Sequence, residues 1–158
     1  MSGTAAAMQS LSPTEFATGS TYEFDAVPTG IALDRDRLLV TLFGGFPFLA
    51  GAGKVVAVAT AGGAIATVVD GLNAPVDLAA APDGRLLVLE HGLYDQTNGF
   101  RAGSGRLLSI DTTSGARTVI LDGLTRPASL LVWDETTVVI TELAGRLDFL
   151  TKETAPAP

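Results

Sequence analysis

Residues 74–90, APVDLAAAPDGRLLVLE, hold the pattern that decides the fold: a short apolar stretch, a polar turn and a second apolar stretch. The same pattern occurs as VPTGIALDRDRLLVTL over residues 27–42 and as RPASLLVWDETTVVITE over residues 126–142. The proline near the start of each copy recurs after 47 and then 52 residues. Short apolar runs on both sides of a polar turn predict pairs of antiparallel strands.

Two further strands follow each pair. The first begins with glycine and a basic residue in every unit, at residues 53–58, 105–110 and 145–150. The second, over residues 64–72 and 116–124, occurs in two units and ends in Asp-Gly-Leu both times. Four short strands that repeat every 47 to 52 residues are typical of the blade of a β-propeller. Because no 3.6-residue periodicity favours helical repeats, the sequence predicts an all-β fold.

The third unit lacks a fourth strand, and the N-terminal region supplies a candidate for it. Residues 21–30, TYEFDAVPTG, match residues 67–76, TVVDGLNAPV, where a fourth strand precedes the next unit. We therefore expect residues 21–25 to complete the last of three four-stranded blades. The expected organisation is an N-terminal tail over residues 1–20, a three-blade half-propeller over residues 21–150, and a polar C-terminal tail over residues 151–158.

Three blades are too few for a closed ring, since propellers have about four to eight blades. Two chains related by a two-fold axis would form six blades, with the N-terminal strand of each chain completing the third blade of the other. A single half-ring would leave a strand edge and apolar blade faces uncovered, which favours association. We therefore predict a homodimer, and the alternative is a half-ring that is stable only with a separate partner half.

Composition excludes several classes of function. The chain has 158 residues, 47% hydrophobic and 17% charged, with a net charge of −7 and no cysteine. The hydrophobic content disfavours disorder, and the negative charge disfavours nucleic-acid binding. The lack of cysteine excludes disulfides, thiolate metal ligands and cysteine nucleophiles. Because no apolar run is long enough to span a membrane and residues 1–16 lack the features of a signal peptide, we expect a cytoplasmic protein with no membrane partner.

The repeats also carry a family resemblance. The strand pattern and the Pro-Asp-Gly-Arg turn at residues 82–85 resemble the NHL and SMP-30-like six-bladed propellers. Residues 40–54, VTLFGGFPFLAGAGK, are similar to the ScyD/ScyE family, in which a Gly-Phe-Pro-Phe loop follows the second strand. The resemblance covers about residues 21–150. It implies a propeller without firmly assigned chemistry, in a family whose members are generally longer and often secreted.

Two long loops mark one face of the expected propeller, which we call the looped face. Loops between second and third strands share this face with the connections between blades, and ligands usually bind there. The first two units carry long loops, over residues 43–52 and 91–104, whereas the third has almost none. The candidate ligand-binding residues of this face are Phe46, Phe48, Asp77, His91, Tyr94, Gln96, Asn98 and Arg101.

The loop residues also have structural interpretations. The loop over residues 91–104 could order itself through a turn at Asn98 and Gly99 without binding anything. Phe43, Phe46 and Phe48 could cap the blades or pack on a neighbouring subunit instead of forming the floor of a ligand site.

His91 is the only histidine and, with Glu90, the candidate catalytic pair. A histidine that acts as a general base needs an orienting carboxylate within hydrogen-bond reach, which Glu90 or Asp95 would have to supply. A lone histidine is more often structural. Whether the chain is an enzyme stays open at this point. We favour no catalytic activity, with a propeller hydrolase of the lactonase or strictosidine-synthase type as the alternative.

Asp77 is the candidate metal ligand. Counting along the repeats matches Thr29, Asp77 and Ser129 at the mouth of the tunnel. SMP-30-like enzymes hold a divalent cation near there with carboxylates and an asparagine, and the resemblance would add Glu90 and Asn73 to Asp77. Calcium or magnesium needs about six oxygen ligands around one point, and no second unit supplies them. We therefore expect no cofactor, with calcium at Asp77 as the alternative and a turn cap as its structural role.

The favoured function is thus a non-catalytic module that binds a small molecule or a protein on its looped face. A propeller hydrolase and a structural subunit of a larger assembly are the alternatives. A hydrogen bond of about 3.2 Å or less between His91 and a carboxylate is the observation that distinguishes the enzyme from the binding module.

Overall fold

The fold consists of β-strands throughout the described part of the chain. The computed structural model describes residues 27–81 and 83–152, which contain thirteen strands and no helix. Consequently, these residues include no helix with the length and apolarity that a membrane crossing requires. The strands form two four-stranded sheets, one three-stranded sheet and one two-stranded hairpin, and all pairings are antiparallel.

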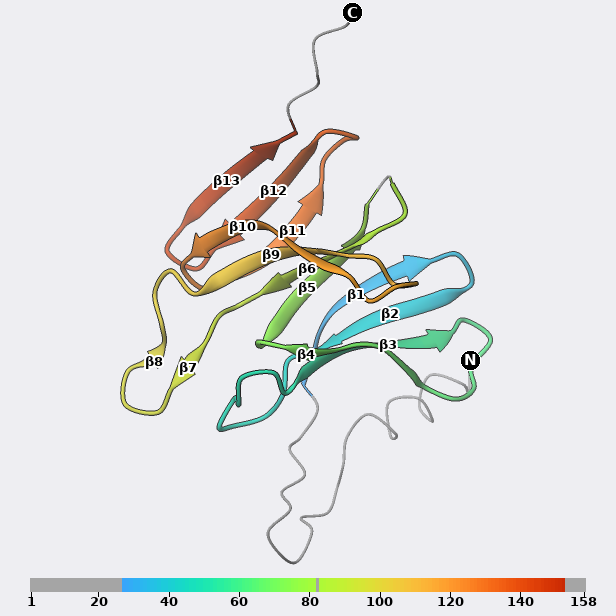
Figure 1. The fold of residues 1–158 in the computed structure, drawn as a ribbon, viewed down its shortest axis with the longest axis horizontal. Helices are drawn as coiled ribbons and strands as arrows, with labels where there is room; N and C mark the ends of the chain where they lie inside the picture. The colour runs from blue at the N-terminus through green and yellow to red at the C-terminus, as the bar shows by residue number, and fades with distance from the viewer. Residues whose placement is uncertain (1–26, 82, 153–158) are drawn as a thin grey trace, which may run out of the picture.

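The three larger sheets are the expected blades, and they follow one another in chain order (Figure 1). Blade 1 consists of β1 (Pro28–Asp34), β2 (Arg37–Leu42), β3 (Gly53–Ala59) and β4 (Ala66–Leu72). Blade 2 consists of β5 (Pro75–Ala80), β6 (Leu86–Glu90), β9 (Gly105–Ile110) and β10 (Arg117–Leu124). Blade 3 consists of β11 (Pro127–Val132), β12 (Thr137–Glu142) and β13 (Arg146–Thr151).

The turns inside the blades are fixed by short side chains, as their composition predicts. Asp134 Oδ1 accepts hydrogen bonds from the backbone N–H groups of Thr136 and Thr137, both at 2.8 Å, and so closes the turn between β11 and β12. In blade 1, Asp34 accepts a hydrogen bond from Nε of Arg37 at 2.9 Å across the corresponding turn. An aspartate that bonds the backbone two or three residues later stabilises a turn without help from the rest of the fold.

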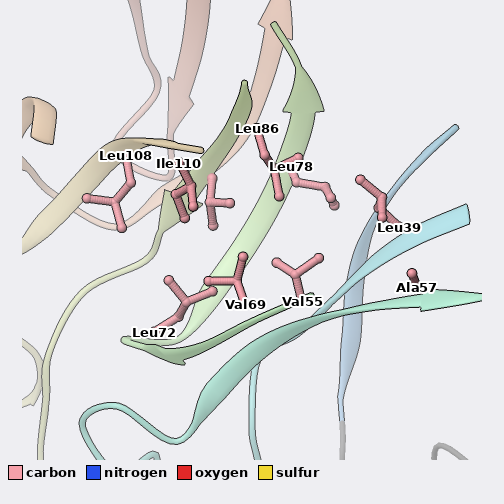
Figure 2. Packing of buried hydrophobic residues seen from close by; sticks show 10 residues of the cluster. Leu39, Val55, Ala57, Val69, Leu72, Leu78, Leu86, Leu108 and Ile110 are labelled. Atoms are coloured by element: carbon pink, nitrogen blue, oxygen red, sulfur yellow. The ribbon is translucent and has the colours of Figure 1, made fainter. Parts of the chain in front are cut away.

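Blades pack on one another through their flat faces, and the core lies between them. Figure 2 shows the cluster between blades 1 and 2, in which Leu39 and Val55 of blade 1 meet Leu78 and Leu108 of blade 2. A second cluster joins blades 2 and 3 through Leu87, Leu89, Leu107, Leu124, Leu130 and Ile140. Full burial of one such side chain contributes about 1.5–3 kcal/mol, so these two interfaces supply most of the apolar stabilisation.

A glycine and a proline meet at each of the two interfaces between blades. Gly53 begins β3, and a Cβ atom at that position would overlap the ring of Pro75, the first residue of blade 2. Gly105 has the same relationship to Pro127, the first residue of blade 3. Both prolines are fully buried. Glycine is therefore required at the start of the third strand because the next blade begins directly against it.

The strand register corrects one match made from the sequence. Each first strand has a β-bulge just after its proline, and beyond it Ile31 pairs with Val40, Leu78 with Val88 and Leu130 with Ile140. The residue of blade 1 that matches Asp77 and Ser129 is therefore Gly30, not Thr29. Gly30, Asp77 and Ser129 each lie two residues after the proline of their blade, and the bulge falls at the same place in all three, so the match of Thr29 was one residue out of step.

The structure confirms a β-propeller of four-stranded antiparallel sheets in the first two blades. Blade 3 contains three strands among the described residues, with β13 at its edge. The predicted strand over residues 21–25 lies outside the described residues, so its role as the fourth strand of blade 3 stays a prediction, as do the domain boundaries. The short hairpin of β7 (Tyr94–Asp95) and β8 (Gly99–Phe100), which was not predicted from the sequence, projects from the end of blade 2 (Figure 1).

Candidate functional site

The long loop of blade 2 is built around the hairpin of β7 and β8. Asp95 Oδ1 accepts hydrogen bonds from the backbone N–H groups of Thr97 and Asn98 at 3.0 and 2.9 Å, and also from the Asn98 side chain. These bonds, first the one from Asn98 and then the one from Thr97, hold the pKa of Asp95 below its usual range. Asp95 and Asn98 thus shape the loop itself, and Gln96 and Arg101 remain exposed beside them.

Aromatic rings join this hairpin to the long loop of blade 1. Phe48 lies between the two loops, with its ring centroid 5.0 Å from that of Tyr94 and 5.4 Å from that of Phe100. Phe43 meets Phe48 and Phe100, each at 5.7 Å, mostly edge to face. Edge-to-face pairs at these distances add about 0.5–1.5 kcal/mol each beyond burial of area. We call this group the aromatic loop cluster; its members are Phe43, Phe46, Phe48, Tyr94 and Phe100.

Phe46 is the member of the cluster that faces solvent. Its ring contacts Phe48 and Tyr94 at 6.0 and 6.1 Å, yet 67% of the residue remains exposed. Leu49 of the same loop and Leu143 of the short blade 3 loop are also more than half exposed. The long loop of blade 1 thus exposes two apolar side chains, Phe46 and Leu49, and exposed apolar surface of this kind is available for binding.

His91 lies beneath the aromatic loop cluster and joins blade 2 to blade 3. It is 8% exposed, and its Nδ1 lies 2.8 Å from the carbonyl oxygen of Pro127, to which it donates in the neutral tautomer. Its ring packs edge to face against Phe100 at 4.6 Å. Burial lowers the pKa of His91 below its ordinary value of 6.5, which favours the neutral ring.

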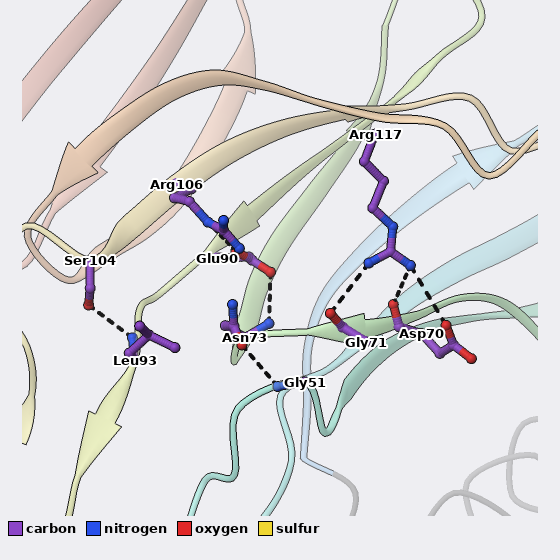
Figure 3. A network of polar contacts seen from close by, with 9 residues as sticks. All are labelled: Gly51, Asp70, Gly71, Asn73, Glu90, Leu93, Ser104, Arg106 and Arg117. Atoms are coloured by element: carbon purple, nitrogen blue, oxygen red, sulfur yellow. Dashed lines mark hydrogen bonds and ion pairs between the residues drawn. The ribbon is translucent and has the colours of Figure 1, made fainter.

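Glu90 is buried and holds the connection between blades 1 and 2. Its Oε1 accepts a hydrogen bond from the backbone N–H of Asn73 at 2.7 Å, and its Oε2 accepts two from Arg106, at 2.5 and 2.8 Å (Figure 3). The Asn73 side chain in turn accepts one from the N–H of Gly51 at 2.9 Å. The carboxylate is 1% exposed, so its charge depends on Arg106 for compensation.

The arrangement of a buried glutamate that accepts a hydrogen bond from the connection between two blades recurs in the next blade. Glu142 occupies the position of Glu90 in blade 3, and its Oε2 accepts a hydrogen bond from the N–H of Thr125 at 3.2 Å. The Thr125 hydroxyl oxygen accepts one from the N–H of Gly103 at 3.0 Å, as Asn73 does from Gly51. Both glutamates therefore brace the chain where it passes between blades, which is a structural role.

Asp77 also bridges two blades. Its Oδ2 accepts hydrogen bonds from the Ser129 hydroxyl and the Leu130 N–H, both at 2.8 Å, and its Oδ1 accepts one from the Leu78 N–H at 2.9 Å. Both oxygens are thus occupied by donors. Within residues 27–81 and 83–152, no three acidic or histidine side chains come together as metal ligands would.

A hollow of about 400 Å³ lies beside the hairpin, where the connection between blades 2 and 3 passes the loop. Arg106, Asp122, Asn73 and Ser104 supply its polar groups, and Leu93 is also in its lining. Ser104 holds the loop in place, since its hydroxyl accepts from the Leu93 N–H at 2.9 Å and donates to the Arg101 carbonyl at 2.7 Å. The volume is within the range of small-ligand sites.

The structure therefore brings some predicted residues together and separates others. Phe46, Phe48 and Tyr94 form one cluster, with His91 directly below it. Asp77 belongs to the interface between blades 2 and 3, and Asn98 to its own turn. Two residues of the site were not predicted from the sequence: Phe100, which contacts four aromatic rings, and Arg106. The spacing of Tyr94 and Phe100 on both sides of an Asp-to-Gly turn was the available signal for the hairpin.

Comparisons with known proteins establish the fold and nothing finer. No protein-family model and no curated protein matches the sequence. Among solved structures, a chain of the nidogen/laminin complex matches with a TM-score of 0.53 and 18% identity, over 79% of this chain and 47% of that one. Virginiamycin B lyase from Staphylococcus aureus matches with a TM-score of 0.49 and 13% identity, over 80% and 42% of the two chains. This chain thus spans less than half the length of either neighbour, and the neighbours are β-propellers.

Proposed function

We propose that this chain is a non-catalytic β-propeller module that binds its ligand on the looped face, at the aromatic loop cluster. The two blades with long loops bring them together, and the rings of the two loops interlock. The third blade has only a tight turn on that face. Residues added to one face of a repeat protein are typical of a binding surface.

One observation carries the proposal: Phe46 stays 67% exposed although it contacts the rings of Phe48 and Tyr94 and belongs to a cluster of five aromatic residues. An exposed aromatic ring that is held rigidly by its neighbours offers a large contact area at little cost in side-chain entropy. Phe46 and Leu49 are apolar contacts of this kind, and Gln96 and Arg101 provide exposed polar groups beside them.

The hollow next to the hairpin favours a small molecule, rather than a large protein surface, as the ligand. It combines the charged side chains of Arg106 and Asp122 with the amide of Asn73 and the hydroxyl of Ser104. Two of the guanidinium nitrogens of Arg106 are bound to Glu90, so Arg106 would add directed hydrogen bonds rather than a free positive charge. A polar small molecule with one ring on the aromatic loop cluster fits both features.

The contacts of His91 and Glu90 favour binding over catalysis. Within the described residues, no hydrogen bond or ion pair joins His91 to a carboxylate, and both Glu90 oxygens are bound elsewhere. A general base held by a backbone carbonyl and covered by aromatic rings lacks the orienting acid that the hydrolase alternative needs. Membership of the ScyD/ScyE family and a cytoplasmic location are part of the proposal and rest on the sequence alone.

The binding proposal can be tested by two-dimensional ¹H–¹⁵N NMR with a library of small polar aromatic compounds. Binders should shift signals of residues 43–52 and 91–104, and Phe46→Ser should weaken their binding at least tenfold. Val119→Ser is the matched control, because Val119 is 46% exposed on β10, away from the loops. Binders whose affinity is unchanged by Phe46→Ser, or which shift only the turns on the opposite face, would overturn the proposal.

A further inference from the structure

The glycine and proline that meet between successive blades also occur at the two ends of the row of blades, where each lacks its partner among the described residues. Gly145 holds the position of Gly53 and Gly105, one residue before the basic residue that pairs with the end of the second strand. No atom among the described residues lies within 4 Å of a Cβ built at Gly145. Pro28, the first residue of blade 1, is exposed, whereas the two prolines that follow it in the repeats are fully buried.

Blade 3 exposes the face with which blades 1 and 2 bind their successors. We call it the trailing face. In blade 2 the matched residues are buried or pack into the second core cluster against blade 3. In blade 3 they are between 55% and 67% exposed, although all four are large and apolar: Leu131, Trp133, Leu147 and Phe149.

Blade 1 exposes the opposite face, which we call its leading face. Ile31 and Leu33 point from it and are 65% and 63% exposed. The residue that matches Ile31 in blade 3, Leu130, is buried against blade 2, and the match of Leu33, Val132, packs on the same cluster. Each end of the row of blades thus presents one half of an interface that the chain already uses twice.

We infer that the trailing face of blade 3 binds the leading face of blade 1 of a second copy, and that two such contacts close a ring of six blades. The occupant is a second copy because the complementary surface to each end is the other end of the same chain. Six blades are within the usual range of closed rings, whereas three are below it. The inference does not depend on the proposed ligand function, because the two faces lie between blades and not on the loops.

The matched positions indicate which residues would meet across the new interface. In blade 2, Ala81 occupies the position of Trp133 and lines the same hollow as Val132, the match of Leu33. Trp133 of one copy would therefore contact Leu33 of the other. Both interfaces resemble a domain core cut in half, so we expect more than about 2,000 Å² to be buried in total.

A charge-exchange experiment on the full chain tests this arrangement. Trp133→Glu and Leu33→Lys should each disrupt both interfaces, since every interface contains one Trp133 and one Leu33. Light scattering after size exclusion should then give the chain mass of 16.2 kDa, against twice that mass for the unmodified chain. An equimolar mixture should recover the doubled mass, because it restores one unmodified interface and places Glu opposite Lys in the other.

A second measurement and a control variant accompany the charge exchange. If a single variant fails to fold, circular dichroism of the mixture still reports recovery of β-structure when the two chains meet. Phe46→Glu changes an equally exposed ring on the looped face and should leave the doubled mass intact. An unmodified chain that is folded at 16.2 kDa overturns the inference, and so does a doubled mass that Trp133→Glu abolishes and Leu33→Lys leaves unchanged.

Discussion

Asp77 and Ser129 occupy the same position in successive blades and are joined by a hydrogen bond of 2.8 Å across the interface between them. The same carboxylate oxygen also accepts from the backbone N–H of Leu130. The first strands of blades 2 and 3 are therefore held together by a side chain where no backbone ladder connects them. In blade 1 the matched residue is Gly30, and a Cβ there would collide with Asp77.

Replacing Asp77 should destabilise the fold. Asp77→Ala removes three accepted hydrogen bonds and leaves the Leu130 N–H without its partner, so we expect a loss of about 2 kcal/mol in the free energy of unfolding. Asp83→Ala is the control, because Asp83 is exposed and bonds only within its own turn; it should cost less than about 0.5 kcal/mol. Urea denaturation of both variants measures the difference, and equal losses would contradict the bridging role.

The same variant tests the calcium alternative. Because both oxygens of Asp77 already accept hydrogen bonds, added calcium should not raise the melting temperature. A rise in the unmodified chain that Asp77→Ala abolishes would show that the site binds the ion.

His91 should make stability depend on pH near neutrality. Its pKa is lowered by burial in the folded chain, so below 6.5 the unfolded chain binds more protons than the folded one. The contribution of His91 to stability is therefore fully present above its unfolded pKa and is lost as the pH falls through 6.5 toward the lower folded value. Because His91 is the only histidine, His91→Gln should flatten the decline between about pH 7.5 and 5.5, as measured by urea denaturation. An equal decline in both proteins would assign it to other groups.

Two phenylalanines of the aromatic loop cluster should differ in their effect on stability. Phe100 contacts four rings, those of Phe43, Phe48, His91 and Tyr94, so Phe100→Ala should cost roughly 2 kcal/mol. Phe46→Ala should cost less than about 1 kcal/mol, because Phe46 is mostly exposed. Thermal unfolding checks the order of the two variants, and the reverse order would contradict the assignment of Phe46 to binding.

The predicted N-terminal strand can be tested by truncation. If residues 21–25 complete a third blade, deletion of residues 1–26 should cause aggregation or loss of folding, since it uncovers the edge strand β13. Deletion of residues 1–15 removes none of the predicted strand and should have little effect. A longer deletion that stays soluble with an unchanged melting temperature would refute the strand prediction.

The strands were predictable because the information that specifies them is local. Each is a short apolar run bounded by turn residues, and the Asp134 turn shows that a single side chain can fix such a boundary. The strands of each blade could therefore be predicted from the sequence. The bulge after Pro28 could not be predicted, because a bulge changes strand pairing without changing composition.

The candidate site was less predictable because it depends on contacts between blades. Phe48 and Phe100 are far apart in the sequence and meet only once blades 1 and 2 have packed. Glu90 next to His91 suggested a catalytic pair, yet Glu90 ends β6 and His91 begins the loop that follows, and the two side chains bind different partners. Glu90 binds Asn73 and Arg106, and His91 binds Pro127.

Sedimentation equilibrium of the unmodified 158-residue chain, over a range of protein concentrations, tests the two-chain ring most directly. We predict a folded species of twice the 16.2 kDa chain mass, with a melting temperature that rises with concentration because association and folding are linked. A folded species of 16.2 kDa at every concentration would contradict the ring.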